Sequence, residues 1–269
     1  MILIKKVLGI IILFLLILTN WYLEIVDTND LAFKKVKTEN ASLFLEAGIS
    51  DKSIKPVINS LDKIKLEYFT RNTYYDIFQP EIYILASKES YNKLVFKLPS
   101  ASTQDSDGVI FLNRMYLFGK SKNFSLQRIL VHEYTHHVQF QVSLNLGISD
   151  KDLPLWFREG FAEYVSRDET NNWETNPTTL IPLNTLTDDN QFYKLSNEFD
   201  TYEMSYHYVY DLIDKFGKDI IEKIMIEYSE VGDFTKAFNN ITDIKIDEYH
   251  LTIDFSNINS QGNKVLIPF

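Results

Sequence analysis

A cluster of histidines limits what the middle of this chain can fold into. The chain has five histidines, and three of them, His132, His136 and His137, lie within six residues. On an α-helix, side chains four residues apart project from one face, so His132 and His136 can offer two imidazoles to one ion. His137 points off that face and is expected to be structural or exposed. The pattern predicts a helix over residues 125–142 with a metal-binding face.

Glu133 and the absence of cysteine indicate the ion and its use. The chain contains no cysteine, which excludes disulfides, cysteine zinc ligands and cysteine nucleophiles. A metal ion must then be held by histidine and carboxylate, and Zn²⁺ suits this donor set. Glu133 lies beside the two histidines but is offset from them, so it can accept a proton from a water at the ion rather than bind the ion itself.

Two histidines make a poor zinc site alone, so a third ligand is expected downstream. The best candidate is Glu159 in the stretch WFREGFAEY, on a second predicted helix over residues 155–166. Three protein ligands leave an open position for water. Glu163, four residues later, shares the face of Glu159. It is either the acceptor that orients a bound imidazole or an ordinary helix-surface charge.

The HExxH pattern of residues 132–136 is short, and the same letters can mark the polar face of a solvated helix. Its context favours the metal site, because a strand precedes it, a helix surrounds it, and a glutamate-bearing helix follows after a loop of suitable length. The sequence therefore predicts one zinc ion held by His132, His136 and Glu159. His250 stands in no such group and is expected at the surface.

Composition limits the class of protein. At 269 residues with 45% hydrophobic content, the chain is long enough to bury a substantial core, and one compact body is the simplest expectation. The 27 basic and 37 acidic residues give a net charge of −10. The chain thus lacks the basic footprint that phosphate binding requires, and no nucleic acid partner is expected.

The order of predicted elements indicates an α+β fold. Apolar runs predict strands at residues 41–46, 81–85 and 108–112, with helices at 53–69 and 88–96 and a polar loop at 100–107. Further helices are expected at 125–142, 155–166, 202–216, 219–229 and from about 233, with a turn-rich stretch at 170–190. A small N-terminal sheet with helices, followed by a mostly helical C-terminal half, makes this one domain over residues 41–269.

The first 26 residues read as a signal anchor or a signal peptide. Lys5 and Lys6 precede the apolar run 7–18, and the interfacial aromatics Trp21 and Tyr22 follow without an A-x-A-like cleavage site. This favours an uncleaved anchor over a removed signal, with a buried core helix as the remaining alternative. Polar residues 27–40 are expected to be a linker. The domain would then work outside the cell membrane, or be secreted if the segment is cleaved.

The two motifs HEYTH and WFREGFAEY resemble the gluzincin branch of zinc metallopeptidases, particularly the peptidase MA-like domains. In that group HExxH is followed by W-x-x-E-G-x-A-E-Y, and the looser likeness extends from Ala41 to about Leu251. The resemblance implies a zincin-like fold and a hydrolytic reaction. It also implies that zinc is bound as expected above and that Glu133 serves as general base and acid.

A tyrosine that stabilises the oxyanion is implied by the resemblance alone. Related aminopeptidases carry it in a Y-E-x-G-like segment, and Tyr202 in TYEMSYHYVYDL has a similar setting, with Ser205 in place of the glycine. Tyr206, one turn later, and the adjacent His207 are alternatives. The tyrosines can also be ordinary core or surface aromatics. No G-x-M-E-N-type exopeptidase segment is present, which favours endopeptidase action.

Two other functions remain open from the sequence. One is a membrane-tethered zinc domain that binds a peptide without cleaving it, although such a module does not need Glu133. The other is zinc-assisted hydrolysis of a non-peptide bond, because no specificity pocket can be read from the letters. The expected partners are a peptide or protein substrate and the membrane, and the oligomeric state is left open.

Overall fold

The computed structural model describes residues 32–49, 79–87, 101–104, 109–113, 126–170 and 180–253, together with positions 59, 61, 63–64, 67–70 and 89–90. The expected membrane segment, residues 1–26, lies outside the described residues, as does most of the helices expected at 53–69 and 88–96. Within the described part of the chain, no helix is both long and apolar enough to cross a bilayer.

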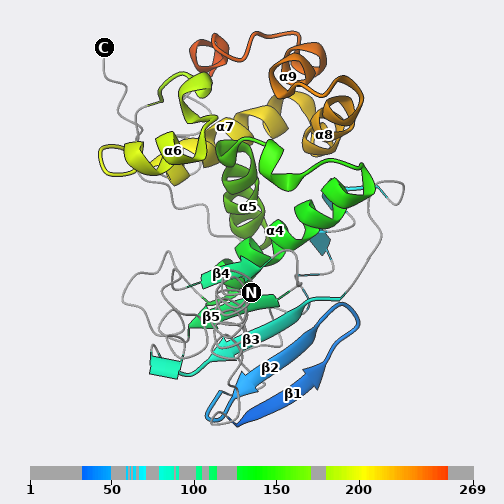
Figure 1. Ribbon diagram of the computed structural model, residues 1–269, viewed down its shortest axis with the longest axis vertical. Helices are drawn as coiled ribbons and strands as arrows, with labels where there is room; N and C mark the ends of the chain where they lie inside the picture. The colour runs from blue at the N-terminus through cyan, green and yellow to red at the C-terminus, as the bar shows by residue number, and fades with distance from the viewer. Residues whose placement is uncertain are drawn as a thin grey trace, which may run out of the picture.

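Five strands form one mixed sheet in the order β1-β2-β3-β5-β4 (Figure 1). Strands β2, β3 and β5 are parallel, and the outer strands β1 and β4 are antiparallel to their neighbours. The strands predicted at 41–46, 81–85 and 108–112 are confirmed to within one residue. The bounds are Phe33–Lys37 for β1, Ser42–Glu46 for β2, Glu81–Leu85 for β3, Ala101–Gln104 for β4 and Val109–Asn113 for β5.

The two outer strands differ from the sequence-based expectation. β1 lies within the segment expected to be a linker, and β4 lies within the expected polar loop 100–107. Both are edge strands, which pair on one side only. Edge strands are often short, polar or lysine-rich, because such residues discourage pairing with another chain. FKKVK and ASTQ fit this description, so neither carries the apolar run that identifies a central strand.

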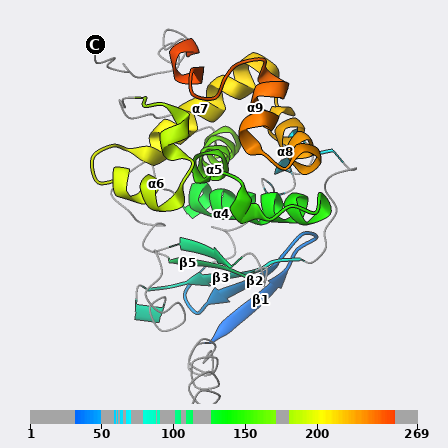
Figure 2. The same ribbon diagram turned by 45° about the horizontal axis from the view of Figure 1, so that its top comes forward.

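The helices cover one face of the sheet. Alternate side chains of β2 and β3, including Leu43, Leu45, Ile82 and Ile84, are buried in the same core as residues of the helices. Helix α4 (Leu126–Asn145) lies across this face and separates the sheet from the remaining helices (Figure 2). On the opposite face, Phe44 stacks on Tyr83 with ring centroids 4.6 Å apart.

The helical half confirms the mixed α+β class. The helices expected at 125–142, 155–166, 202–216, 219–229 and from 233 are all present, and α6 is an addition that begins at the end of the stretch 170–190, which was expected to be rich in turns. The bounds are Leu155–Thr170 for α5, Asp189–Leu195 for α6, Thr201–Phe216 for α7, Ile220–Val231 for α8 and Phe234–Thr242 for α9. Short 3-10 helices lie at Asp150–Asp152, Leu183–Leu186 and Tyr249–Thr252.

Helix α5 occupies the middle of the helical half (Figure 1). Its Trp156 is fully buried, with its ring centroid about 6 Å from those of Tyr208 on α7 and of Phe234 and Phe238 on α9. Gly160 allows α5 and α7 to approach closely, since a Cβ there would lie 2.3 Å from the carbonyl oxygen of Ser205. The tryptophan and the glycine of WFREGFAEY thus fix where α5 lies.

Ser205 replaces the glycine that the resemblance leads one to expect, and the packing accounts for it. Its hydroxyl donates to the carbonyl oxygen of Thr201 on its own helix at 2.7 Å. The side chain is therefore small and turned back along α7, which leaves the backbone of α7 accessible to Gly160.

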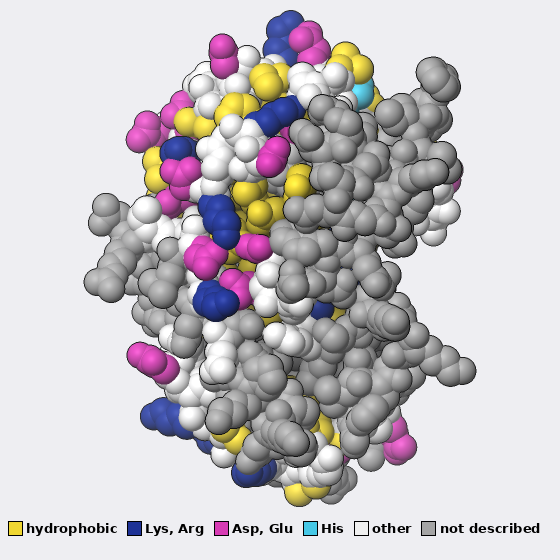
Figure 3. Space-filling model, turned by 180° about the vertical axis from the view of Figure 1, so that it is seen from behind, with side chains coloured by type: hydrophobic (Ala, Val, Ile, Leu, Met, Phe, Trp, Pro, Cys, Tyr) yellow, Lys and Arg dark blue, Asp and Glu magenta, His cyan; other side chains and the backbone are white. Residues whose placement is uncertain are grey.

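The surface carries charge of both signs. On the face seen from behind in Figure 3, acidic and basic side chains of the described residues lie side by side around a band of hydrophobic side chains. One such pair elsewhere in the described structure is Lys218 and Glu67, whose side chains are 2.6 Å apart. Pairs exposed in this way contribute little to stability.

Candidate metal centre

Helix α4 presents two imidazoles on the side that faces α5. His132 and His136 lie one turn apart, their ring centroids are 4.9 Å apart, and their Nε2 atoms are separated by 3.2 Å. Neighbouring residues Leu130, Val131 and Tyr134 are fully buried in the core. Burial of these side chains fixes the rotation of α4, and the rotation in turn fixes where the imidazoles point.

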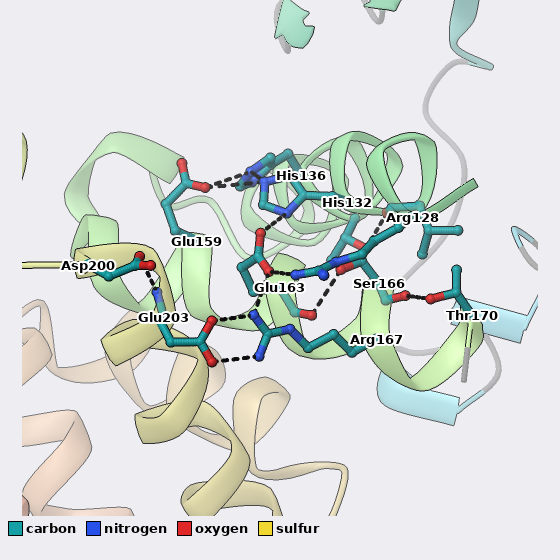
Figure 4. Close-up of polar contacts among 12 residues, drawn as sticks. Arg128, His132, His136, Glu159, Glu163, Ser166, Arg167, Thr170, Asp200 and Glu203 are labelled. Atoms are coloured by element: carbon teal, nitrogen blue, oxygen red, sulfur yellow. Dashed lines mark hydrogen bonds and ion pairs between the residues drawn. The ribbon is translucent and has the colours of Figure 1, made fainter. Parts of the chain in front are cut away.

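Glu159 on α5 completes a three-residue cluster. Its Oε2 atom lies 3.3 Å from His132 Nε2 and 3.4 Å from His136 Nε2. One ligand atom from each of the three residues falls within 4.8 Å of the others. Figure 4 shows the three side chains pointing toward one another from the two helices. The proximity predicted for these residues is confirmed.

The donor set fits a zinc ion. Two imidazoles and one carboxylate, converging from rigid helices, match the His₂Glu sets found in catalytic zinc sites. Burial alone lowers the pKa of His132, but hydrogen bonds and charges from Glu159 and Glu163 raise it to about 10. Burial raises the pKa of Glu159, yet the charge and hydrogen bonds of the two histidines bring it well below its usual range. The negative charge of Glu159 therefore stabilises positive charge at the point where the three ligand atoms meet.

Glu163 lies behind His132 rather than at the surface. Its Oε1 atom is 3.3 Å from His132 Nδ1, the ring nitrogen opposite the one that faces Glu159. Its Oε2 atom is 2.5 Å from Arg128 Nη2 and 3.3 Å from Arg167 Nη2. Glu163 is 9% exposed, so the alternative of an ordinary surface charge is wrong. The geometry is that of an acceptor that orients an imidazole.

Glu133 lies next to His132 on α4 and is buried. It is not one of the three residues that make up the cluster. Its negative charge contributes to raising the pKa of His136, which indicates that the carboxylate is close to the cluster. This position is compatible with a base that acts beside the ion.

The three candidates for an oxyanion donor lie in different surroundings. Tyr202, at the start of α7, is 38% exposed, whereas Tyr206 is 2% exposed and His207 is fully buried. Burial raises the pKa of Tyr202, as do the charges of Glu159 and Glu133, so its hydroxyl keeps its proton. The ring of Tyr206 instead lies 3.7 Å from the guanidinium carbon of Arg167. Of the three, Tyr202 is the one that combines exposure with an electrostatic effect of Glu159 on its hydroxyl.

The other histidines lie apart from the cluster. His137 is fully buried, with its ring centroid 5.8 Å from that of Tyr134, which is the structural role expected for it. His250, expected at the surface, is partly buried in the 3-10 helix near the end of the described chain.

Sequence reasoning missed four residues around the site. Arg128 precedes His132 by four residues and Arg167 follows Glu163 by four, so helical spacing could have placed both arginines on the site face. Glu203 on α7 had no comparable signal, because it reaches the site only through packing of α7 on α5. Tyr193 on α6 is 52% exposed, and its pKa is raised by partial burial and by the charge of Glu159.

Comparison with known proteins agrees with this geometry. The profile of the peptidase M9 family, described as collagenase, matches residues 99–252, which include both motif segments. An uncharacterized protein of Bacillus subtilis (strain 168), YhcO, is 35% identical over 129 residues, which are 46% of this chain and 38% of that protein. The match thus spans well under half the length of that relative. Because the family profile covers more than half of this chain, the chain belongs to the collagenase (M9) family of zinc metallopeptidases.

Proposed function

We propose that the chain hydrolyses peptide bonds with one zinc ion held in a gluzincin arrangement by His132, His136 and Glu159. The observation that carries the proposal is the convergence of these three side chains, with nitrogen and oxygen atoms 3.2 to 3.4 Å apart, from two tightly packed helices. When bound, zinc supplies a Lewis acid that polarises the scissile carbonyl and lowers the pKa of water.

Glu133 acts as the general base in this proposal. Its carboxylate accepts a proton from the attacking water and then gives that proton to the nitrogen of the leaving amine. Its burial, its place beside His132 and its position outside the cluster of three possible ligands support this role. Cleavage of internal peptide bonds, as by an endopeptidase, is the expected reaction, since no exopeptidase segment is recognisable in the sequence.

Tyr202 donates the hydrogen bond that stabilises the developing oxyanion. Its partial exposure lets a substrate reach the hydroxyl, and its raised pKa keeps the proton in place. Tyr206 and His207 are weaker candidates, because both are buried against the Arg167 and Glu203 side chains.

The N-terminal segment bears on where the protein works. We propose that residues 1–26 direct the domain to the outer side of the cell membrane, which the Lys5–Lys6 pair and the apolar run 7–18 support. In a bacterial host, protease added to intact cells should degrade the domain of the full chain, and deletion of residues 2–26 should leave the domain protected inside. Equal protection of both proteins would contradict this proposal.

Zinc dependence tests the proposed activity. Residues from about 27 onward should bind one zinc ion per chain and cleave members of a peptide library. Removal of the metal with a chelator should abolish cleavage, and stoichiometric zinc should restore it. Zinc binding without cleavage of any peptide, together with saturable peptide binding, would favour the non-catalytic binding module instead.

A further inference from the structure

Four buried charged side chains form a network beside the metal centre. Arg128 comes from α4, Glu163 and Arg167 come from α5, and Glu203 comes from α7 (Figure 4). Each is 9% exposed or less. Buried charges are costly unless they are paired and hydrogen-bonded. Two arginines against two glutamates give a network whose charges balance.

The contacts within the network show which residue holds which. Arg167 binds Glu203 through two contacts, Nη1 to Oε1 at 3.0 Å and Nη2 to Oε2 at 2.7 Å. Such paired contacts between a guanidinium and a carboxylate are strong and fix direction. The same Nη2 atom reaches Glu163 Oε2 at 3.3 Å, where it meets the guanidinium of Arg128. Glu203 therefore holds Arg167, and the two arginines together hold one oxygen of Glu163.

The other oxygen of Glu163 faces the metal ligand. Oε1 lies 3.3 Å from His132 Nδ1, and the hydrogen bond at this nitrogen fixes the tautomer and orientation of an imidazole that binds metal through Nε2. The two guanidiniums that contact Oε2 come from different directions, so they restrict how the carboxylate can turn and thereby where Oε1 lies. The position of the His132 ring is in this way tied to α7 through Glu163, Arg167 and Glu203.

Arg167 also ties α5 to the part of α7 that carries the proposed oxyanion donor. Its guanidinium lies over the ring of Tyr206 at 3.7 Å, a favourable cation–π contact. Glu203 lies in the first turn of α7, where its backbone N–H donates to the capping side chain of Asp200 at 3.1 Å. Tyr202 is the residue before Glu203. The contacts of Glu203 with Asp200 and Arg167 therefore fix the helical turn that carries Tyr202.

We propose that Arg167 and Glu203 are positioning residues of the metal centre. They hold His132 in its ligand orientation through Glu163 and set the first turn of α7 against the zinc ligands. The inference rests on the proposed zinc site, but its main readout, the affinity for zinc alone, requires no peptide cleavage. Neither residue touches substrate or metal in this scheme.

The test compares the zinc affinity of the folded protein with and without the ion pair between Arg167 and Glu203. In Glu203→Gln, Arg167 loses its carboxylate partner and turns fully toward Glu163, which draws Oε1 away from His132. Zinc affinity, measured by competition with a chromophoric chelator, should fall about tenfold or more. The absorption spectrum of the cobalt-substituted protein should shift, because one imidazole changes its orientation.

A matched control separates positioning from general stability. Tyr249→Phe removes a buried hydrogen bond of 2.5 Å to Asp211 near the other end of the same helix. This variant should lower the melting temperature of the zinc-free protein and leave zinc affinity within about twofold of wild type. If Glu203→Gln behaves like Tyr249→Phe, losing thermal stability alone, Arg167 and Glu203 are merely structural and the proposal is overturned.

A second variant covers the case in which Glu203→Gln does not fold. The double replacement Arg167→Met with Glu203→Leu removes both charges, so no buried charge is left without its partner. It should fold and show the same loss of zinc affinity, because Arg128 alone then holds Glu163. Wild-type affinity in this variant contradicts the proposal. Absence of zinc binding in the wild-type protein would instead contradict the proposed function.

Discussion

Two carboxylates on one face of α5, Glu159 and Glu163, belong to regions of opposite character. Glu159 faces two imidazoles in the metal centre, whose three side chains are 13 to 15% exposed. Glu163 faces two guanidiniums in the charge network, where the arginine side chains are at most 5% exposed. Four residues of separation thus give one carboxylate imidazole partners, which can bind either a proton or a metal cation, and give the other carboxylate permanent cations.

The difference shows how one helix assigns two roles to one residue type. Arginine is always charged at accessible pH, so the network is complete within the protein. Imidazoles can bind either a proton or a metal ion, so the metal centre can exchange one for the other. The network supplies the fixed charge that holds the exchangeable site in shape.

Removal of the Glu159 carboxylate should have the largest effect, because it removes one of the three proposed zinc ligands. Glu159→Gln leaves two imidazoles without a carboxylate ligand, and we expect zinc to be lost on dialysis and peptide cleavage to fall to background. Zinc content by atomic absorption and cleavage rate check this. Zinc content at the wild-type level would show that the cluster of the three residues is not the metal site.

Two of the tyrosines of α7 lie one beside each region: Tyr202 is affected by the charge of Glu159, and Tyr206 packs on Arg167 of the charge network. Tyr202→Phe should lower kcat by about 10² to 10³, as for loss of an oxyanion donor, with zinc affinity unchanged. Tyr206→Phe keeps its ring over Arg167 and should change kcat by less than about threefold. Steady-state kinetics of both variants decide the matter, and the reverse order of effects would assign the donor to Tyr206.

Glu163→Gln should affect both regions at once. His132 loses a charged acceptor, so zinc affinity should fall by about 10- to 100-fold. Arg128 and Arg167 lose their common partner while Arg167 keeps Glu203, and removing one partner from a buried ion pair costs about 3 to 5 kcal/mol of unfolding free energy. Zinc titration and denaturant unfolding measure the two effects. A loss of zinc affinity with unchanged stability would mean that the arginines do not depend on Glu163.

The zinc-free protein should also differ between the two regions in how its stability depends on pH. The pKa of His132 is raised in the folded protein from 6.5 to about 10, so its protonated form stabilises the fold. That stabilisation is complete below pH 6.5 and is lost as the pH rises toward 10. The network should show no such loss, because its arginines stay charged. Unfolding curves at several pH values test this, and zinc-free Glu159→Gln should show a weaker dependence.

The sequence was sufficient to predict the cluster of His132, His136 and Glu159, because its signals are local. Spacing within α4 placed His132 beside His136, and the stretch WFREGFAEY identified Glu159. The central strands were predictable since their apolar runs are continuous. The edge strands β1 and β4 were not, because strands that pair on one side need no apolar run.

The charge network required the structure. Arg128 and Arg167 have the helical spacing of the site face, but an arginine on a helix is usually solvated, and burial cannot be read from spacing. Glu203 meets Arg167 only because Gly160 lets α7 approach α5. The choice between Tyr202 and Tyr206 likewise depends on which side of α7 stays open, a property of packing rather than of the motif.

Substitution of the base tests the proposed hydrolysis most directly. Glu133→Gln keeps the size of the side chain and removes its ability to accept a proton, without altering the three zinc ligands. Zinc stoichiometry and peptide cleavage should be measured on the same preparation. We expect one zinc ion per chain, as in the wild-type protein, and cleavage slower by about 10² to 10⁴. Cleavage at the wild-type rate with zinc fully bound would contradict the assignment of Glu133 and the hydrolytic mechanism built on it.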